Sequence, residues 1–271
     1  MQILTIAGYK FTSLDERDQL RTDFFQICRT LALKGTILLS KEGINLNLAG
    51  NATNITSFKQ YLKKDPRFTD MVFHELFSDN IPFQHLKIKL KQEIITLRQP
   101  EVDAVTHRAP HLSPTVFKQW LDEKRDITVL DTRNDYEVRF GTFKGAIHLQ
   151  LTDFSKFPAA IHRSLQNSSL KNKPIVMFCT GGIRCEKAAL HLINQGFSDV
   201  YQLDGGILGY FATVGSTHYE GECFVFDERT SVDANLKETG TAQCRACHGP
   251  VSKEQQQLST YMKGVSCPTC A

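Results

Sequence analysis

Residues 175–190 constrain the fold more than any other part of the chain. They run IVMFCTGGIRCEKAAL: four apolar residues, a cysteine, two adjacent glycines, and then apolar residues at helical spacing. The apolar run predicts a buried strand of a parallel sheet, and the glycines allow a tight turn into a helix. Cys179 is therefore expected at the carboxyl end of a strand and before a helix, at the edge where parallel sheets bind ligands.

The predicted loop surrounds Cys179 with groups that favour a thiolate. Free N–H groups of the loop, the positive end of the helix dipole and the guanidinium of Arg184 all act in this direction. A free cysteine titrates near ~8.5, and such surroundings lower the pKa to about 3.5–7.5. We predict that Cys179 is a catalytic nucleophile supported by the rest of its loop, Thr180, Gly181, Gly182, Ile183, Arg184 and Cys185. The alternative is a buried cysteine that only fills space.

Strands and helices alternate on both sides of this loop, which predicts an α/β domain with a parallel sheet over residues 113–212. Residues 99–112 contain two prolines and little periodicity, so they are expected to be a linker. Asp131 follows another buried strand and also lies at the ligand-binding edge. A structural role, in which its carboxylate holds neighbouring backbone, is the preferred interpretation of Asp131.

Residues 1–98 predict a ferredoxin-like (acylphosphatase-like) domain. Their order is strand, helix, two strands, helix and strand, the split βαβ arrangement, and further strands follow at 83–90 and 93–97. A capping box formed by Ser13 and Glu16 is expected to start the first helix.

The strand at residues 86–91 alternates leucine or isoleucine with lysine. Lys87, Lys89 and Lys91 therefore share one face. This face is either a solvated outer surface that prevents aggregation at a sheet edge or a set of phosphate contacts.

Residues 213–271 hold the second strong motif, two Cys-x2-Cys pairs separated by 19 residues. Paired cysteines at this separation are typical of a tetrahedral four-thiolate zinc site. The predicted ligands of a structural zinc ion are Cys244, Cys247, Cys267 and Cys270, with His248 able to replace one of them. The alternatives are four unrelated cysteines, or a redox dithiol that serves the loop of Cys179.

Bulk properties restrict the class of protein. The chain of 271 residues is 41% hydrophobic and 23% charged, values typical of globular domains. It has no apolar run long enough to cross a membrane and no signal-peptide pattern, so we expect a cytoplasmic protein with no membrane partner. Eight cysteines in this setting favour free thiols or metal ligands over disulfides. The positive excess lies in residues 1–100, with 14 basic against 10 acidic residues.

Two segments resemble a rhodanese domain. FCTGGIRCEKAALHLINQGFSDVYQLDGGILGY is similar to its active-site half, and VLDTRNDYEVRFGTFKGAIHL is similar to its first half. Cys179 matches the position that carries a persulfide in that superfamily. Cys185 lies where most rhodaneses have serine, and Thr142 replaces a common histidine. The tyrosine-phosphatase pattern fits less well because only four residues, not five, separate Cys179 from Arg184.

Nearly the whole chain resembles the bacterial tRNA uridine 5-hydroxylase (TrhO) family, through KEGIN, LKIKLKQEIITL, CTGGIRCEKA and GECFVFDER. The resemblance implies oxygen-dependent hydroxylation of the wobble uridine to 5-hydroxyuridine, with Cys179 as the essential cysteine. It implies the anticodon stem-loop of tRNA as partner, rather than DNA, and molecular oxygen as co-substrate. No flavin, haem or nucleotide motif is evident. With a tRNA substrate, Lys87, Lys89, Lys91 and Lys41 become candidate phosphate contacts.

The resemblance suggests a mechanism in which the Cys179 thiolate attacks C6 of uridine and C5 gains enolate character. Oxidised Cys179 would be able to form a disulfide with Cys185. Two alternatives from other classes remain. One is a sulfurtransferase that passes persulfide sulfur from Cys179 to tRNA or a protein acceptor. The other is a tRNA-binding scaffold whose rhodanese domain is inert.

Overall fold

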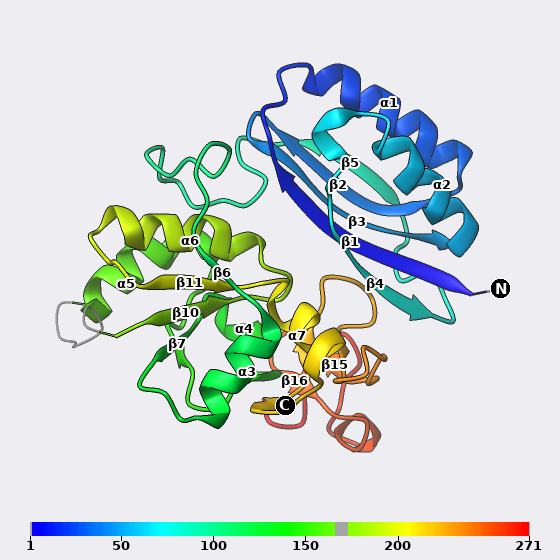
Figure 1. Ribbon diagram of the computed structural model, residues 1–271. Helices are drawn as coiled ribbons and strands as arrows, with labels where there is room; N and C mark the ends of the chain where they lie inside the picture. Colours follow the sequence, from blue (N-terminus) through cyan, green and yellow to red (C-terminus); the bar gives the residue numbers. More distant parts are fainter. Residues whose placement is uncertain (1, 166–172, 271) are drawn as a thin grey trace. The chain divides into compact units, whose positions relative to one another are not determined.

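The computed structural model describes residues 2–165 and 173–270, which divide into two units (Figure 1). The first unit comprises Met1–Ala109 together with Glu186–Phe197, and the second comprises Pro110–Cys185 together with Ser198–Ala271. Among the described residues, no helix combines the length and the apolar character that a membrane span requires.

The first unit has the predicted ferredoxin-like order with one added strand. Its sheet runs β4-β1-β3-β2-β5; the first four strands pair antiparallel, and β5 joins β2 in parallel. The elements are β1 (Ile3–Phe11), α1 (Arg17–Thr30), β2 (Lys34–Ser40), β3 (Gly43–Asn51), α2 (Ala52–Leu62), the short helix η1 (Pro66–Phe68), β4 (Phe73–Ser78) and β5 (Leu86–Leu90).

The apolar face of each helix explains this packing. Phe24 and Cys28 of α1 and Phe58 of α2 are fully or almost fully buried in one core with Ile6 and Leu46 of the sheet. Figure 1 shows both helices on the same side of the sheet. The other face of this sheet carries the alternate strand residues, whose side chains point away from the two helices.

Two local predictions for this unit are wrong. Helix α1 begins at Arg17 and has no side-chain cap, because the Glu16 carboxylate pairs with Arg67 instead of closing a capping box. Residues 93–97 form no strand. There the Glu93 carboxylate accepts hydrogen bonds from the N–H groups of Leu97 (2.9 Å) and Arg98 (3.1 Å), which bends the chain.

The second unit contains the predicted parallel α/β sheet, in the order β6-β11-β10-β7-β9 with every pairing parallel. Figure 1 shows α5 on one side of this sheet and α3 and α7 on the other. Ser113 caps α3 by accepting from Val116 N, with Pro114 in the first turn. The elements are β6 (His111–Leu112), α3 (Pro114–Asp122), β7 (Thr128–Asp131), α4 (Asp135–Val138), β9 (Ile147–His148), the short helix η2 (Phe154–Lys156), α5 (Phe157–Leu165), β10 (Ile175–Phe178), α6 (Ile183–Asn194), β11 (Val200–Leu203) and α7 (Gly206–Val214).

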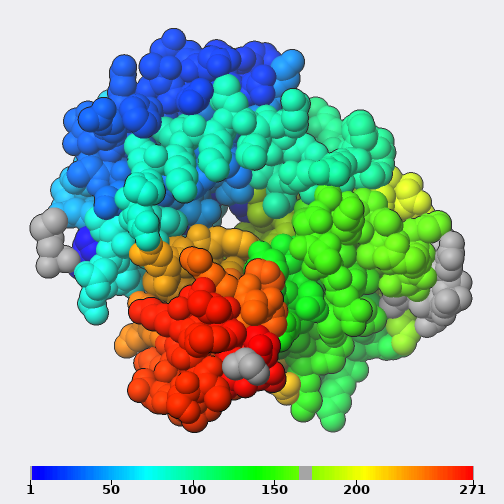
Figure 2. All heavy atoms as spheres, turned by 180° about the vertical axis from the view of Figure 1, so that it is seen from behind, coloured from blue at the N-terminus to red at the C-terminus, as the bar shows by residue number. Residues whose placement is uncertain are grey.

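Short antiparallel pairs complete the second unit. Strand β8 (Gly141–Phe143) pairs with β12 (Tyr219–Gly221), β13 (Cys223–Phe224) with β14 (Ser231–Val232), and β15 (Ala242–Gln243) with β16 (Pro250–Val251). A short helix, η4 (Gln255–Gln257), follows. The cysteine-rich residues form the orange to red lobe of Figure 2. These elements are too short to bury a large hydrophobic core, so a bound metal ion would add stability to this segment.

Helix α6 is divided between the two units after Cys185. Within the first unit, the Nζ atom of Lys187 lies 2.8 Å from a carboxylate oxygen of Glu42 and 2.6 Å from one of Glu93. Tyr9 donates a hydrogen bond of 3.1 Å to Glu186, the residue that precedes Lys187. Glu186 and Lys187 are thus held within the first unit by partly buried polar contacts.

Candidate active site

Cys179 lies at the carboxyl end of β10, and its side chain is fully buried. Strand β10 is apolar throughout and pairs with a strand on each side, so its end is fixed in the sheet. The loop then turns through Gly182 at φ +100°, a conformation that glycine adopts without strain. This turn brings Gly182 N to 3.1 Å from Cys179 Sγ.

Several groups make the sulfur of Cys179 acidic. Burial alone raises its pKa, but a hydrogen bond from Cys185, the positive charge of Arg184 and the N–H groups of Arg184 and Gly182 outweigh this effect and lower the pKa to about 6. Burial and the neighbouring Cys179 thiolate raise the pKa of Cys185 well above its usual value. In the buried pair, Cys179 is therefore the thiolate and Cys185 is the protonated donor.

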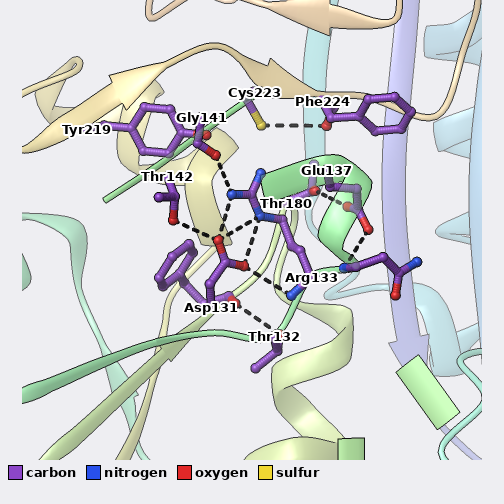
Figure 3. A network of polar contacts seen from close by, with 12 residues as sticks. Asp131, Thr132, Arg133, Glu137, Gly141, Thr142, Thr180, Tyr219, Cys223 and Phe224 are labelled. Carbon is purple, nitrogen blue, oxygen red and sulfur yellow. Dashed lines mark hydrogen bonds and ion pairs between the residues drawn. The ribbon is translucent and has the colours of Figure 1, made fainter. Parts of the chain in front are cut away.

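Glu137 holds Arg184 in place from the short helix α4. Its two carboxylate oxygens accept hydrogen bonds of 2.6 and 2.7 Å from the guanidinium, and both side chains are almost completely buried. The same carboxylate accepts bonds from Thr180 Oγ1 (3.3 Å) and from the backbone N–H of Asn134 (3.1 Å). Figure 3 shows Glu137 and Thr180 within this network. Glu137 thus connects Arg184, in the first turn of α6, to the segment that follows β7.

Asp131 has the structural role that was preferred from the sequence. It forms a fully buried ion pair with Arg133, with an N–O distance of 2.7 Å, and accepts a further bond of 2.8 Å from Thr142 (Figure 3). Arg133 also donates to the carbonyl oxygen of Gly141 at 2.6 Å. All donors to Asp131 are internal, so this acid fixes the loop after β7 and the start of β8.

Helix α7 holds the other side of the cysteine loop. The N–H groups of Ile207 and Leu208 donate to the carbonyl oxygens of Cys179 and Thr180, both at 3.0 Å. Gly206 permits this approach: a Cβ atom there would lie 2.4 Å from the Cys179 carbonyl oxygen. With these carbonyl groups occupied by α7, the N–H side of the loop faces the sulfur.

The other predicted residues of the cysteine loop differ in their exposure. Thr180 and Gly182 are buried, whereas Gly181 and Ile183 are partly exposed. Solvent does not reach Cys179 itself in this conformation.

The candidate RNA-binding lysines lie in the first unit, apart from the cysteine loop in sequence. Lys87 and Lys89 are exposed on β5, the edge strand, and flank the buried Ile88. Lys91 follows directly after the strand, and Lys41 lies in the turn between β2 and β3; both are exposed. This placement fits a charged sheet edge as well as a phosphate-binding face.

The structure brings the four C-terminal cysteines together. One ligand atom from each lies within 4.8 Å of the others, and His248 is not a member of this group. The distances between sulfur atoms that we measure, 3.3, 3.5 and 3.8 Å, are close to the ~3.8 Å edge of a tetrahedron with Zn–S bonds of about 2.3 Å. Arg139 donates to the carbonyl oxygen of Cys247 at 2.7 Å and so attaches this knuckle to the domain of the cysteine loop. The group can bind a metal ion such as zinc.

Glu137, Thr132 and Cys223 also belong to this site and were not predicted from the sequence. Glu137 lies in Asn-x-x-Glu, a helix-start pattern that was visible but not used. Thr132 places its Oγ1 3.6 Å from Cys185 Sγ. Cys223 is a third buried thiol of this region, and burial raises its pKa to about 12 (Figure 3). No local pattern marks Thr132 or Cys223, because only the fold brings them to the site.

Comparisons with known proteins agree with this architecture. Residues 3–94 match a family model described as the UPF0176 acylphosphatase-like domain, and residues 113–213 match the rhodanese-like domain. The tRNA uridine(34) hydroxylase of Cupriavidus pinatubonensis is 47% identical over 100% of this chain and 97% of its own length. That of Ralstonia nicotianae is 46% identical with the same coverage, and that of Burkholderia orbicola is 44% identical over 100% of this chain and 98% of its own. The resemblance inferred from the motifs is thereby confirmed, and the chain belongs to the tRNA uridine(34) hydroxylase family.

Proposed function

We propose that this protein hydroxylates the uridine at position 34 of tRNA to 5-hydroxyuridine and that Cys179 is its catalytic nucleophile. The observation that carries the proposal is the Cys179 sulfur, which has a pKa of about 6 and lies 3.1 Å from Gly182 N, in a chain that matches the hydroxylases over its full length. Because the substrate is tRNA, we expect the protein in the cytoplasm.

In the proposed reaction, the Cys179 thiolate adds to C6 of the uracil ring. C5 then carries the electron density that reacts with oxygen, and the loop N–H groups and Arg184 stabilise the negative charge on the uracil oxygen. The overall reaction is uridine, dioxygen and two thiols giving 5-hydroxyuridine, water and a disulfide. One oxygen atom enters the base, and the other leaves as water with two hydrogens from the thiols. Expulsion of Cys179 from C6 restores the double bond.

Cys185 supports this cycle in two ways. Its S–H group donates to the Cys179 thiolate before attack. After Cys179 leaves C6, its thiolate would take the outer oxygen atom of the 5-hydroperoxyuridine, which gives 5-hydroxyuridine and a Cys179 sulfenic acid. The sulfenic acid would condense with the Cys185 thiol and release water, and two external thiols would then reduce the disulfide. The external thiols in this step are the reductant of the overall reaction.

A sulfurtransferase that forms a persulfide on Cys179 is the second candidate. The same N–H groups that hold a thiolate also stabilise a terminal persulfide anion, and residues 113–213 match the rhodanese-like domain. The two functions differ in their need for oxygen and in the product formed on tRNA.

The test incubates tRNA that lacks the modification with purified protein and a thiol, in air and without oxygen, followed by mass spectrometry of the nucleosides. We expect 5-hydroxyuridine only in air, and none with Cys179→Ser. Cys28→Ala, which removes a buried thiol of the first unit, is the matched control and should retain product. Product formed by Cys179→Ser refutes covalent catalysis by this sulfur. A thiolated uridine formed without oxygen, in a parallel reaction that contains thiosulfate as the sulfur donor, supports the sulfurtransferase.

The ferredoxin-like domain, residues 1–98, is the proposed RNA-binding domain, with Lys87, Lys89, Lys91 and Lys41 on phosphates of the anticodon stem-loop. The support is the exposure of all four side chains and the positive excess of this part of the chain. Each lost phosphate contact should reduce the slope of log affinity against log salt by about 0.7–0.9.

This proposal is tested by the double variant Lys87→Ala/Lys89→Ala. We expect weaker binding of a synthetic stem-loop in fluorescence anisotropy and a shallower salt slope. The matched control is Lys63→Ala/Lys64→Ala, which removes two exposed lysines at the end of α2. Equal effects of the two double variants would show that only net charge matters and would refute the specific face.

We further propose that Cys244, Cys247, Cys267 and Cys270 hold one structural zinc ion. Four protein thiolates fill a tetrahedral site and leave no open position for catalysis. The ion would attach a segment with little core of its own to the rest of the second unit. The linker was expected over residues 99–112, but His111 and Leu112 form β6 of the second sheet, so the proposed linker ends before that strand. Residues 113–212 remain the proposed rhodanese domain, and residues 213–271 the proposed zinc-binding segment.

A further inference from the structure

We infer that Phe226 is a stacking platform for a base of the bound RNA next to the target uridine, an inference that rests on the proposed tRNA substrate. Phe226 lies at the tip of the hairpin formed by β13 and β14 in the second unit. Its side chain is 52% exposed, although its chain neighbours Phe224 and Val225 are buried.

Phe226 lies beside the group that controls the reactive sulfur. The guanidinium carbon of Arg184 is 5.8 Å from the centre of the Phe226 ring, within range of a cation–π contact. The same guanidinium helps to lower the pKa of Cys179. The exposed ring of Phe226 therefore lies next to Arg184, a residue of the cysteine loop.

Internal contacts hold the hairpin tip in a single shape. Arg229 and Asp227 form an ion pair with both side chains at most 5% exposed, and Val225 N donates to the Thr230 carbonyl oxygen at 2.9 Å. The ring of Phe226 meets that of Phe224 edge to face, with centres 5.3 Å apart. A rigid aromatic side chain loses little entropy when a base stacks on it.

Arg184 also has a donor that the protein leaves unused. Its two terminal nitrogens bind Glu137, but Nε is buried and has no hydrogen-bond partner among the described residues. A buried donor without a partner costs free energy, so an acceptor supplied by a ligand would offset that cost. Bases and phosphates of single-stranded RNA supply such acceptors, and aromatic rings are the usual platform for their unstacked bases.

Among the described residues, the other large exposed aromatic side chains, Phe25 at 44% and Phe77 at 50%, belong to the first unit and not to the unit of the cysteine loop. Leu258 and Met262 are each also 52% exposed, but they have no aromatic ring on which a base can stack. Leu258 is therefore a control matched to Phe226 in exposure.

The experiment uses the full-length protein and a synthetic anticodon stem-loop with the fluorescent base 2-aminopurine at either nucleotide flanking the target uridine. We expect Phe226→Ala to weaken binding roughly 5- to 150-fold, the range measured when a stacking aromatic is removed. It should also remove the quenching of 2-aminopurine. Phe226→Trp should retain affinity and quenching, and Leu258→Ala should bind like the wild type.

Two further measurements separate stacking from other causes. The salt slope of binding should be the same for Phe226→Ala and wild type, because no charge is removed. The midpoint of thermal unfolding and the rate of Cys179 alkylation report whether the fold and the loop survive. If Phe226→Ala fails to fold, Phe226→Leu, which keeps an apolar side chain without a ring, takes its place with the same expected loss.

Each outcome has a distinct meaning. Unchanged affinity and quenching in Phe226→Ala overturn the inference even when the wild type makes 5-hydroxyuridine. Stacking without any hydroxylated product upholds the inference and refutes the proposed reaction. A wild-type protein that does not bind the stem-loop refutes both.

Discussion

Replacing Cys185 by alanine tests how the protein makes Cys179 acidic. The Cys185 thiol donates to the Cys179 sulfur, whose pKa lies at about 6, and the substitution removes this donor while leaving the charged groups in place. Arg184 is a poorer target, because its removal leaves the buried Glu137 carboxylate without its ion-pair partner, which costs about 3–5 kcal/mol of stability. Cys185→Ser keeps a donor at the same place and is the matched control.

The size of the effect follows from the lost hydrogen bond. A hydrogen bond to a charged group contributes about 1.5–3 kcal/mol, and one pKa unit corresponds to about 1.36 kcal/mol. An S–H group is a weak donor, so we expect an increase of about one unit, to a pKa near ~7. At pH 6 the thiolate fraction would then fall from about one half to about one tenth, an approximately fivefold decrease, but only about twofold at pH 7.

The assay is the rate of alkylation by iodoacetamide across pH, with the peptide that contains Cys179 quantified by mass spectrometry. Only the thiolate reacts, so the rate rises with pH through the pKa, and a higher pKa moves the curve to higher pH. The wild type and Cys185→Ser should have midpoints near pH 6, and Cys185→Ala a midpoint about one unit higher.

Two results would refute this reasoning. A wild-type midpoint near ~8.5, the value of a free cysteine, would mean that the loop does not favour the thiolate. A Cys185→Ala midpoint equal to that of the wild type would leave Arg184 and the loop N–H groups as the whole cause, and Cys185 would have no part in ionisation.

Three further substitutions test other parts of the structure. Gly206→Ala should raise the Cys179 midpoint and cost more than about 1 kcal/mol of stability, because its Cβ would meet the Cys179 carbonyl oxygen at 2.4 Å. Gly215 also has a positive φ, +75° against +60° at Gly206, but a Cβ there would meet no atom within 4 Å, so Gly215→Ala should leave the midpoint unchanged. Cys244→Ser should abolish bound zinc in atomic emission, and a chelator should lower the unfolding midpoint of the wild type but not of this variant. Asp131→Asn leaves a buried arginine unpaired and should cost about 3–5 kcal/mol in urea unfolding while Cys179 alkylation keeps its pH profile.

The local features of the chain were sufficient to predict the main elements. The apolar run at 175–178, the glycines at 181 and 182 and the helical spacing after them each act over a few residues, and β10, its loop and α6 form where expected. The alternation in 86–90 likewise predicted a strand with one buried and one exposed face. The two Cys-x2-Cys pairs predicted the four-cysteine group, because the two residues between the cysteines of a pair already place both sulfur atoms at a distance suitable for one metal ion.

Local signals failed where a distant side chain competed for the same group. The capping box at Ser13 did not form because Glu16 binds Arg67, which lies 51 residues away in the chain. The strand expected at 93–97 was replaced by a bend, since Glu93 binds the backbone N–H groups after it and Lys187 of α6. Hydrophobic periodicity contains no information about such pairs.

The sequence by itself determined that a cysteine would follow a buried strand, with glycines and Arg184 beside it. Only the tertiary structure decided its chemistry: Glu137 fixes the arginine, Cys185 supplies the proton donor, and Ile207 and Leu208 of α7 take the loop carbonyls. The physical reason is that ionisation of a buried sulfur depends on the charges and donors around it in space, and those groups come from α4, α6 and α7, which are distant in the sequence.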